Sequence, residues 1–267
     1  MTARLVTLTT DVGPAYAAQI KGVLYRCLPP GHVVDLVDDM APYEVAEAAF
    51  LLRHMGARFP RGTVHLAIVD PGVGGRRAPI AVACRDGSYL VGPDNGLLDP
   101  LAQHLGIRSV VRLDPRRIGA VVPRSRTFEG RDLFAPAAAR LALGSPIRSL
   151  GAPAAITPAP YAAPVVTDTA VRGRVVHVDR FGNLITDIPP ELVPREGARV
   201  RVQFPGRRRA PLLRAPTYEA GRIGQAMLVR SSFDLLEVSV REGNAARRFR
   251  IRPGDPIAIG RRAVRYR

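Results

Sequence analysis

The sequence predicts two domains of different class: an N-terminal α/β domain with a mostly parallel sheet, and a small all-β, barrel-like C-terminal domain. Strand-like and helix-like segments alternate over residues 1–151, which is typical of a parallel sheet covered by helices. Residues 152–166 are rich in proline and alanine, a composition typical of a semi-rigid linker. Residues 167–267 contain only short strand-like segments between turn residues, which favours a barrel or sandwich.

The N-terminal domain is expected to alternate strands and helices. In its first helix Ile20, Val23 and Leu24 lie at helical spacing. Pro29 and Pro30 follow, and a helix cannot continue through them. Helices are expected at 16–28, 44–59, 97–105 and 133–143. Strands are expected at 4–9, 33–37, 64–69, 80–84, 88–91 and 110–113.

The C-terminal domain is expected to consist of short strands without a long helix. Each strand-like segment is rich in β-branched or apolar residues and is bounded by turn residues, which is the pattern of an all-β domain. The expected strands are 171–178, 184–188, 199–204, 226–229, 235–240 and 256–259.

Composition narrows the classes of function. With 46% hydrophobic and 23% charged residues, the chain can bury a large core. No apolar run approaches the roughly 20 residues that cross a bilayer, and the N-terminus does not resemble a secretion signal, so we expect a cytoplasmic protein without membrane contact. The two cysteines, Cys27 and Cys84, are too few for a disulfide framework, and the histidines lack ligand spacing, so no metal site is predicted.

The net charge of +16 raises the possibility of nucleic-acid binding. However, the arginines are spread along the chain, and Lys21 is the only lysine, which indicates a coding bias rather than selection for phosphate contacts. Aromatic residues make up only 6%, and no motif supplies base stacking or base readout. Nucleic-acid binding is therefore the minority hypothesis, as a weak and salt-sensitive property, and we expect no nucleic-acid partner.

Polar residues follow several predicted strands. The segment V-H-L-A-I-V-D-P-G-V-G-G-R-R (64–77) reads as a buried strand that delivers Asp70 to a glycine-rich loop with arginines close by. In open α/β sheets, ligands bind beyond the carboxyl ends of the strands. Taken singly, each such loop is more often an ordinary turn than a site. The polar residues at these positions are Asp11, Asp70, Arg77, Asn95, Glu129, Arg131 and Asp132 in the first domain, and Asp179, Asn183 and Asn244 in the second.

These loops together resemble the S-adenosylmethionine hydrolase family, the S-adenosylmethionine hydroxide adenosyltransferases, which are relatives of the fluorinase and chlorinase. The resemblance covers nearly the whole chain, and the segments occur in the family's order. The matching segments are L-T-T-D-V-G (8–13) with I-K-G (20–22), D-P-G-V-G (70–74) with Arg77, V-G-P-D-N-G-L-L (91–98), T-F-E-G-R-D-L-F-A-P (127–136), D-R-F-G-N-L-I-T-D-I (179–188), S-F-D-L-L-E (232–237) and G-N-A-A (243–246).

The resemblance implies attack of water on the ribose C5′ of S-adenosyl-L-methionine, releasing adenosine and L-methionine. The sulfonium makes methionine a good leaving group, so the difficulty lies in activating and aligning the water. Asp70 is expected to orient or deprotonate the water and Arg77 to stabilise hydroxide character. No cofactor or metal is needed. A homotrimer is also implied, with each site between one subunit's N-terminal domain and its neighbour's C-terminal domain.

The remaining site residues are likewise assigned by resemblance. Their expected partners are parts of S-adenosyl-L-methionine. They are Asp11 for the ribose hydroxyls, Asp179 for the methionine ammonium, Ser232 for the methionine carboxylate, Phe181 and Asn183 for adenine, Asn244 and Ala246 for adenine through backbone groups, and Asn95 and Glu237 as further substrate-binding residues.

Glu129 departs from the family pattern, which places a histidine at this position beside the aspartate and arginine. A glutamate here could serve as a base, with a pKa raised by the neighbouring carboxylate, or could pair with Arg77 and weaken its hold on hydroxide. The alternatives are therefore a protein that binds S-adenosylmethionine or adenosine without turnover, motivated by Glu129, and a halide-using adenosyl transferase. Asp70 disfavours the second, because the halogenases carry tyrosine there and a buried anion repels halide.

Overall fold

A computed structural model of the chain describes residues 3–29, 31–37, 40–119, 126–207 and 209–264. The chain divides into two compact units, Met1–Tyr161 and Ala162–Arg267. Their classes confirm the predicted ones: the first unit combines a sheet with helices, and the second is built around a β-barrel. Among the described residues, no helix is long and apolar enough to cross a membrane.

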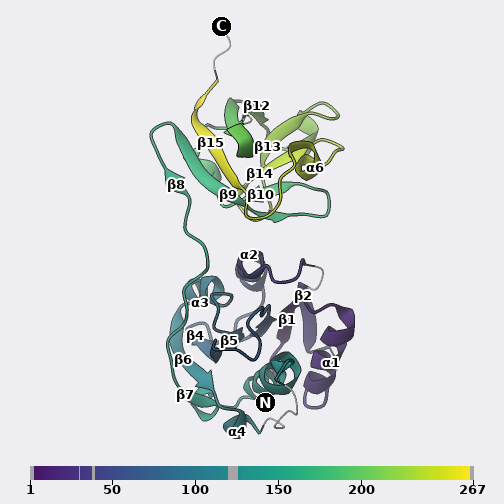
Figure 1. The fold of residues 1–267 in the computed structure, drawn as a ribbon, viewed down its shortest axis with the longest axis vertical. Coiled ribbons are helices and arrows are strands. Elements are labelled where there is room, and N and C mark those ends of the chain that lie inside the picture. The colour runs from purple at the N-terminus through teal and green to yellow at the C-terminus, as the bar shows by residue number, and fades with distance from the viewer. Residues whose placement is uncertain (1–2, 30, 38–39, 120–125, 208, 265–267) are drawn as a thin grey trace. The chain divides into compact units, whose positions relative to one another are not determined.

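The N-terminal unit contains a seven-stranded mixed sheet (Figure 1). Strands β2, β1, β3 and β5 pair in parallel. Strand β4 pairs antiparallel with both β5 and β6, so β6 runs in the same direction as β5. Five of the seven strands therefore share one direction, as a mostly parallel sheet requires. In spatial order the strands are β2 (Val33–Val37), β1 (Val6–Thr10), β3 (Val64–Ile68), β5 (Tyr89–Pro93), β4 (Pro79–Cys84), β6 (Ile107–Leu113) and β7 (Gly151–Pro153).

Helices cover both faces of this sheet. Successive residues of β3 point to opposite faces, so Leu66 packs with α1 and α5 while Ala67 packs with α2 and α3. All five residues of β3 are buried, which explains why all but His65 are apolar. The helical segments are α1 (Pro14–Tyr25), α2 (Val45–Gly56), α3 (Asp99–Leu105), α4 (Pro115–Ile118), the π-helix η1 (Gly130–Phe134), α5 (Ala135–Ala142) and the 3₁₀ turn η2 (Ile147–Ser149).

The C-terminal unit closes seven strands into a barrel. The hydrogen-bonded order is β10, β14, β13, β12, β11, β15 and β9, and β9 pairs back to β10 while β8 extends β9 outside the ring. Closure leaves the seven strands without a free edge. The bounds are β8 (Val165–Val166), β9 (Ala170–Val178), β10 (Leu184–Thr186), β11 (Arg199–Gln203), β12 (Arg209–Arg214), β13 (Ala226–Arg230), β14 (Leu236–Val240), β15 (Pro256–Ala263), α6 (Ala245–Phe249) and the turns η3 (Pro190–Leu192), η4 (Pro205–Arg207) and η5 (Tyr218–Ala220).

Part of the proline- and alanine-rich stretch lies against the N-terminal unit. The Thr157 N–H donates to Asp94 Oδ1 at 2.6 Å, and the Ala159 N–H donates to Asp99 Oδ2 at 2.9 Å. Asp94 directly follows β5, and Asp99 is the first residue of α3. The stretch around 157–159, which we call the strap, is therefore fastened to the same unit as the strands that precede it.

Candidate active site

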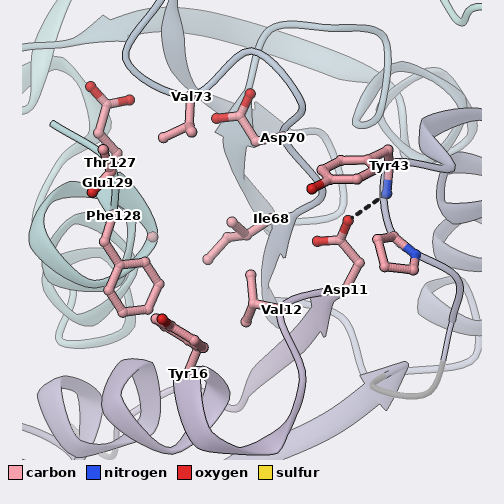
Figure 2. Close-up of a pocket in the computed structure, with 12 residues that line it drawn as sticks. Asp11, Val12, Tyr16, Tyr43, Ile68, Asp70, Val73, Thr127, Phe128 and Glu129 are labelled. Atoms are coloured by element: carbon pink, nitrogen blue, oxygen red, sulfur yellow. Dashed lines mark hydrogen bonds between the residues drawn. The ribbon is translucent and has the colours of Figure 1, made fainter.

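The carboxyl ends of β1 and β3 open into a pocket of about 480 Å³ in the N-terminal unit, here called the N-terminal pocket (Figure 2). Adjacent parallel strands end at one edge of the sheet, so the residues that follow them lie close together. Asp11 comes directly after β1, and Asp70 comes two residues after β3. The pocket is lined by Asp11, Val12, Tyr16, Pro42, Tyr43, Ile68, Asp70, Val73, Thr127, Phe128, Glu129 and Gly130.

Arg77 joins two carboxylates at this pocket. Its Nε donates to Asp70 Oδ2 at 2.9 Å, and its Nη2 donates to both Asp70 Oδ2 and Glu129 Oε2. The side chains of Asp70, Arg77 and Glu129 are only 6, 10 and 17% exposed. Charge-assisted bonds in so protected a setting are strong and fix the geometry. The structure therefore brings together the three residues predicted to be catalytic.

The environment of Arg77 favours its charged form. Burial by itself lowers the pKa of Arg77, but the hydrogen bonds and charges of Asp70 and Glu129 outweigh burial, so the pKa lies above its ordinary value. The guanidinium also lies over the ring of Phe134, with its carbon 5.4 Å from the ring centroid, a favourable cation–π geometry. Arg77 is therefore a fixed positive charge beside Asp70.

The loop after β3 is shaped so that Asp70 can meet Glu129. Gly74 adopts a φ of 74°, and a Cβ there would lie 3.0 Å from the backbone oxygen of Arg126. Only glycine allows this approach without strain. Asp70 Oδ1 also accepts the Gly72 N–H at 3.2 Å, which fixes the carboxylate orientation. The close contact with Arg126 places the loop beside the segment that carries Glu129.

Asp11 and Tyr43 form another part of the pocket. The Tyr43 N–H donates to Asp11 Oδ2 at 2.8 Å, as the dashed line in Figure 2 shows. Tyr43 has a φ of 71°, which is uncommon outside glycine, and its side chain is 72% exposed. The bond to Asp11 helps to hold this conformation. No pattern in the sequence marks Tyr43, and it was not among the predicted site residues.

Two further aromatic residues line the pocket and were not predicted. Tyr16 in α1 and Phe128 make an edge-to-face contact with ring centroids 5.3 Å apart, the arrangement that aromatic quadrupoles favour. Phe128 lies inside the matched segment 127–136, so that resemblance could have identified it. In the sequence Tyr16 is only the first residue of a predicted helix, and nothing there marks it as a site residue.

Asn95 lies beside the backbone that leads to Asp70 and is not among the residues that line the N-terminal pocket. Its Nδ2 donates to the Val69 carbonyl at 2.9 Å, and its Oδ1 accepts the Leu97 N–H at 3.2 Å. Val69 directly precedes Asp70. In this structure the Asn95 side chain braces the backbone beside Asp70, and its role in substrate binding stays a prediction.

The C-terminal unit has a second polar pocket, of about 580 Å³, here called the C-terminal pocket. Asp179 Oδ1 accepts the N–H groups of Phe181 and Asn183 at 3.0 and 2.8 Å, and its Oδ2 accepts Asn183 Nδ2 at 2.9 Å. The carboxylate thus closes its own turn. Phe181 is left 75% exposed. The lining residues are Asp179, Phe181, Asn183, Tyr218, Glu219, Val240, Arg241, Glu242 and Gly243.

The turn at 179–183 packs against the segment that starts α6. Gly182 has a φ of 85°, and a Cβ there would come within 2.1 Å of the Asn244 side chain. The Ala246 N–H donates to the Gly182 carbonyl at 2.9 Å, while Asn244 caps α6 by accepting the Arg247 N–H at 2.7 Å. The structure therefore brings Asn244 and Ala246 next to the turn that carries Phe181 and Asn183. The Ala246 N–H and the Asn244 side chain are both already hydrogen-bonded within the protein.

Glu237 and Ser232 occupy contrasting positions. Glu237 is 3% exposed in β14, and its Oε1 accepts from Tyr218 Oη and Ser239 Oγ. Ser232 is exposed in the turn between β13 and β14. Neither residue lines the C-terminal pocket, so their predicted contacts with substrate remain predictions. Among the described residues, no group of three or more His, Cys, Asp and Glu side chains could hold a metal ion.

Comparisons with known proteins agree with these features. Residues 6–151 match the SAM hydroxide adenosyltransferase N-terminal domain, and residues 173–258 match the C-terminal domain of the same family. The chain is 38% identical to (R)-S-adenosyl-L-methionine hydrolase of Salinispora tropica, over 95% of this chain and 97% of that protein. It is 37% identical to the Thermus thermophilus protein of the same name, over 96 and 99%. The crystal structure of an uncharacterized conserved protein from Thermotoga maritima is similar, with a TM-score of 0.89, 32% identity and coverage of 96 and 100%.

Proposed function

The chain belongs to the SAM hydroxide adenosyltransferase family, and we propose on this premise that it hydrolyses S-adenosyl-L-methionine to adenosine and L-methionine. The observation that supports the proposal best is the carboxylate of Asp70, bonded to Arg77 at the edge of a pocket. An aligned carboxylate and a fixed positive charge are what the activation of water requires.

In the proposed reaction, water attacks C5′ of the ribose from the side opposite the sulfonium. Asp70 orients the water and accepts a proton from it, while Arg77 stabilises the developing hydroxide. The C5′–S bond breaks and its electron pair goes to sulfur, so neutral methionine leaves without an acid. Asp11 binds the ribose hydroxyls, a task for which a carboxylate has suitable acceptors. The proposal requires no cofactor.

The C-terminal pocket and residues near it in the same unit are proposed to bind the rest of the substrate. Asp179 would attract the methionine ammonium, Ser232 the methionine carboxylate, and Phe181 would pack against adenine with Asn183 as a hydrogen-bonding partner. Asn244 and Ala246 would contact adenine through backbone groups. Because the Ala246 N–H already donates to Gly182, a contact through that N–H requires the bond to be exchanged on binding, whereas a contact through the carbonyl oxygen does not.

We further propose that the active form is a homotrimer, in which the N-terminal pocket of one subunit meets the C-terminal pocket of its neighbour. Exposed aromatic side chains at each pocket support this proposal: Tyr43 and Tyr16 are 72 and 54% exposed at the first, and Phe181 is 75% exposed at the second. Large exposed aromatic groups are typical of surfaces that bind another molecule. The cytoplasmic location and the lack of a nucleic-acid partner remain predictions.

A non-catalytic binding protein is the second candidate, and the bond between Arg77 and Glu129 favours it. A guanidinium shared by two carboxylates presents less positive charge to hydroxide. One assay separates the candidates: purified protein is incubated with S-adenosyl-L-methionine, with and without chloride, and nucleosides are resolved. Adenosine with methionine supports hydrolysis, a 5′-halo-nucleoside supports a transferase, and bound nucleoside without turnover supports a binding protein.

Asp70→Asn tests the proposed mechanism directly. The amide cannot accept a proton, so we expect kcat to fall by about 10²–10⁴-fold, the range for loss of a general base. Arg76→Ala is the matched control, because Arg76 is exposed next to Arg77, and it should change kcat less than about twofold. Retained turnover in Asp70→Asn would show that this carboxylate does not activate the water.

A further inference from the structure

Glu237 is a buried carboxylate whose bonds lead to the C-terminal pocket. Only 3% of the residue is exposed. Its Oε1 accepts Tyr218 Oη at 2.6 Å and Ser239 Oγ at 2.7 Å. A buried carboxylate is costly unless hydrogen bonds satisfy it, so these two donors account for its presence. They differ in position: Ser239 is fully buried in β14, whereas Tyr218 lines the pocket.

Tyr218 is held at the pocket through a hydrogen bond of its hydroxyl. It begins the three-residue turn η5, and 46% of it is exposed. Its hydroxyl donates to the buried Glu237 carboxylate, and a hydrogen bond to such a group constrains the orientation of the ring. The pKa of Tyr218 is raised by burial, by the bond to Glu237 and by nearby negative charge, so its hydroxyl stays protonated and remains a donor.

Burial also raises the pKa of Glu237, and the hydrogen bonds from Tyr218 and Ser239 oppose that rise. Asp179, which lines the pocket, adds to it through charge repulsion. The carboxylate therefore sits close enough to the predicted ligand Asp179 to act on it electrostatically, yet it does not line the cavity. Two roles follow: Glu237 could act by its charge, or by holding Tyr218.

We propose that Glu237 is a positioning residue that acts by holding Tyr218, so that the tyrosine ring forms a fixed wall of the C-terminal pocket. The inference rests on the proposed function, since it assigns that wall to substrate binding. Because the hydroxyl donates its proton to Glu237, it cannot donate that proton to substrate, and the ring offers substrate an apolar face. In this proposal Glu237 acts through Tyr218, in place of the direct contact with substrate that the resemblance implies.

Kinetics of four variants test this role. Tyr218→Phe and Glu237→Ala each remove the hydrogen bond and should raise KM about fivefold, the effect of one lost bond of about 1 kcal/mol. Because the reacting groups Asp70 and Arg77 are untouched, kcat should change less than about twofold. Glu237→Gln keeps an acceptor for Tyr218 and should restore KM to within about twofold of wild type. The double variant Tyr218→Phe/Glu237→Ala should have a KM no higher than either single variant, because both substitutions remove the same hydrogen bond.

Ser239→Ala is the matched control, since it removes the other donor to the same oxygen from a residue outside the pocket. It should lower the melting temperature without raising KM. An unchanged KM in Tyr218→Phe would overturn the proposal. A KM in Glu237→Gln as high as in Glu237→Ala would also overturn it, and would show that Glu237 acts by its charge.

Two further measurements separate this inference from the proposed function. Alkaline absorbance titration, with Tyr218→Phe as reference, should show Tyr218 ionising at lower pH in Glu237→Ala, and an unchanged titration would overturn the hydrogen-bonded role. Adenosine affinity by calorimetry should fall by the same factor as KM rises. A wild-type protein that neither binds adenosine nor consumes S-adenosyl-L-methionine would instead overturn the proposed function.

Discussion

Arg77 is shared between two carboxylates, and the division of its hydrogen bonds determines what the catalytic residues can do. Asp70 receives bonds from both Nε and Nη2, whereas Glu129 receives one from Nη2. The arginine is therefore bound more completely to Asp70. A water molecule near Asp70 would experience a positive charge that Glu129 partly offsets.

Glu129→His tests the effect of that offset. Replacing the carboxylate by a neutral imidazole frees one arm of Arg77, so we expect a kcat equal to or above that of wild type. Steady-state kinetics at neutral pH measures it, and Glu129→Gln serves as the control for loss of charge without a new base. A large fall in kcat in both variants would show that the Glu129 carboxylate has a catalytic role of its own.

At the scale of single residues, a matched segment was needed for a prediction but did not guarantee its outcome, since Asn95 and Glu237 lie in matched segments and do not line a pocket. Asp70, Arg77 and Glu129 meet in the structure as expected, since the strand-to-loop pattern and the resemblance both identified them. Tyr43 and Tyr218 lie outside every matched segment, and their positions depend on contacts with residues distant in sequence. No local pattern could reveal that a tyrosine hydroxyl would meet Glu237 from a separate turn.

At the scale of elements, the strap shows how the loop after β5 is fixed. Gly96 has a φ of 90°, and a Cβ there would lie 2.6 Å from the carbonyl oxygen of Pro158. The neighbouring Asn95 donates to the carbonyl of Val69, the residue before Asp70. The strap therefore contacts the loop after β5, and that loop in turn contacts the end of β3. The strap's composition predicted an extended chain but not this docking, because docking depends on the carboxylates of Asp94 and Asp99.

Gly96→Ala should loosen the strap. The substitution adds backbone strain at positive φ, about 1 kcal/mol or more, and a clash with Pro158. We expect faster limited proteolysis between residues 154 and 161, mapped by mass spectrometry. Gly119→Ala is the control, because Gly119 also has a positive φ of 69° but its Cβ would meet nothing within 4 Å among the described residues. Equal cleavage rates in the two variants would contradict a docked strap.

At the scale of the whole molecule, the order of element types predicted both domain classes. The closed barrel was less accessible to prediction, because β12 (Arg209–Arg214) was not expected. It contains Pro211, and proline argues against a central strand. The structure accommodates it in a strand that pairs fully with β11 but joins β13 at only two positions. Closure thus depends on a strand that local propensity does not favour.

Subunit mixing tests the proposed trimer. Asp70→Asn disables the N-terminal pocket and Asp179→Ala the C-terminal pocket, so each variant alone should be inactive. If each active site combines pockets from two subunits, co-refolding equal amounts should restore roughly one quarter of wild-type activity, since one random pairing in four joins two intact pockets in a closed ring. No recovery in mixed trimers, verified by light scattering, would place both pockets of a site in one subunit.

The π-helical turn η1 sets how strictly the length of this segment is constrained. Its hydrogen bond spans five residues, from the Ala135 N–H to the Gly130 carbonyl, and Glu129 precedes it while Phe134 ends it. Both of these residues contact Arg77. The wide π turn holds one residue more than an α-helical turn, so the extra residue is contained within it while Glu129 and Phe134 both still reach Arg77. Removing a residue inside the turn would therefore give an ordinary α-helical turn, and the segment is constrained less by its length than by the two side chains at its ends.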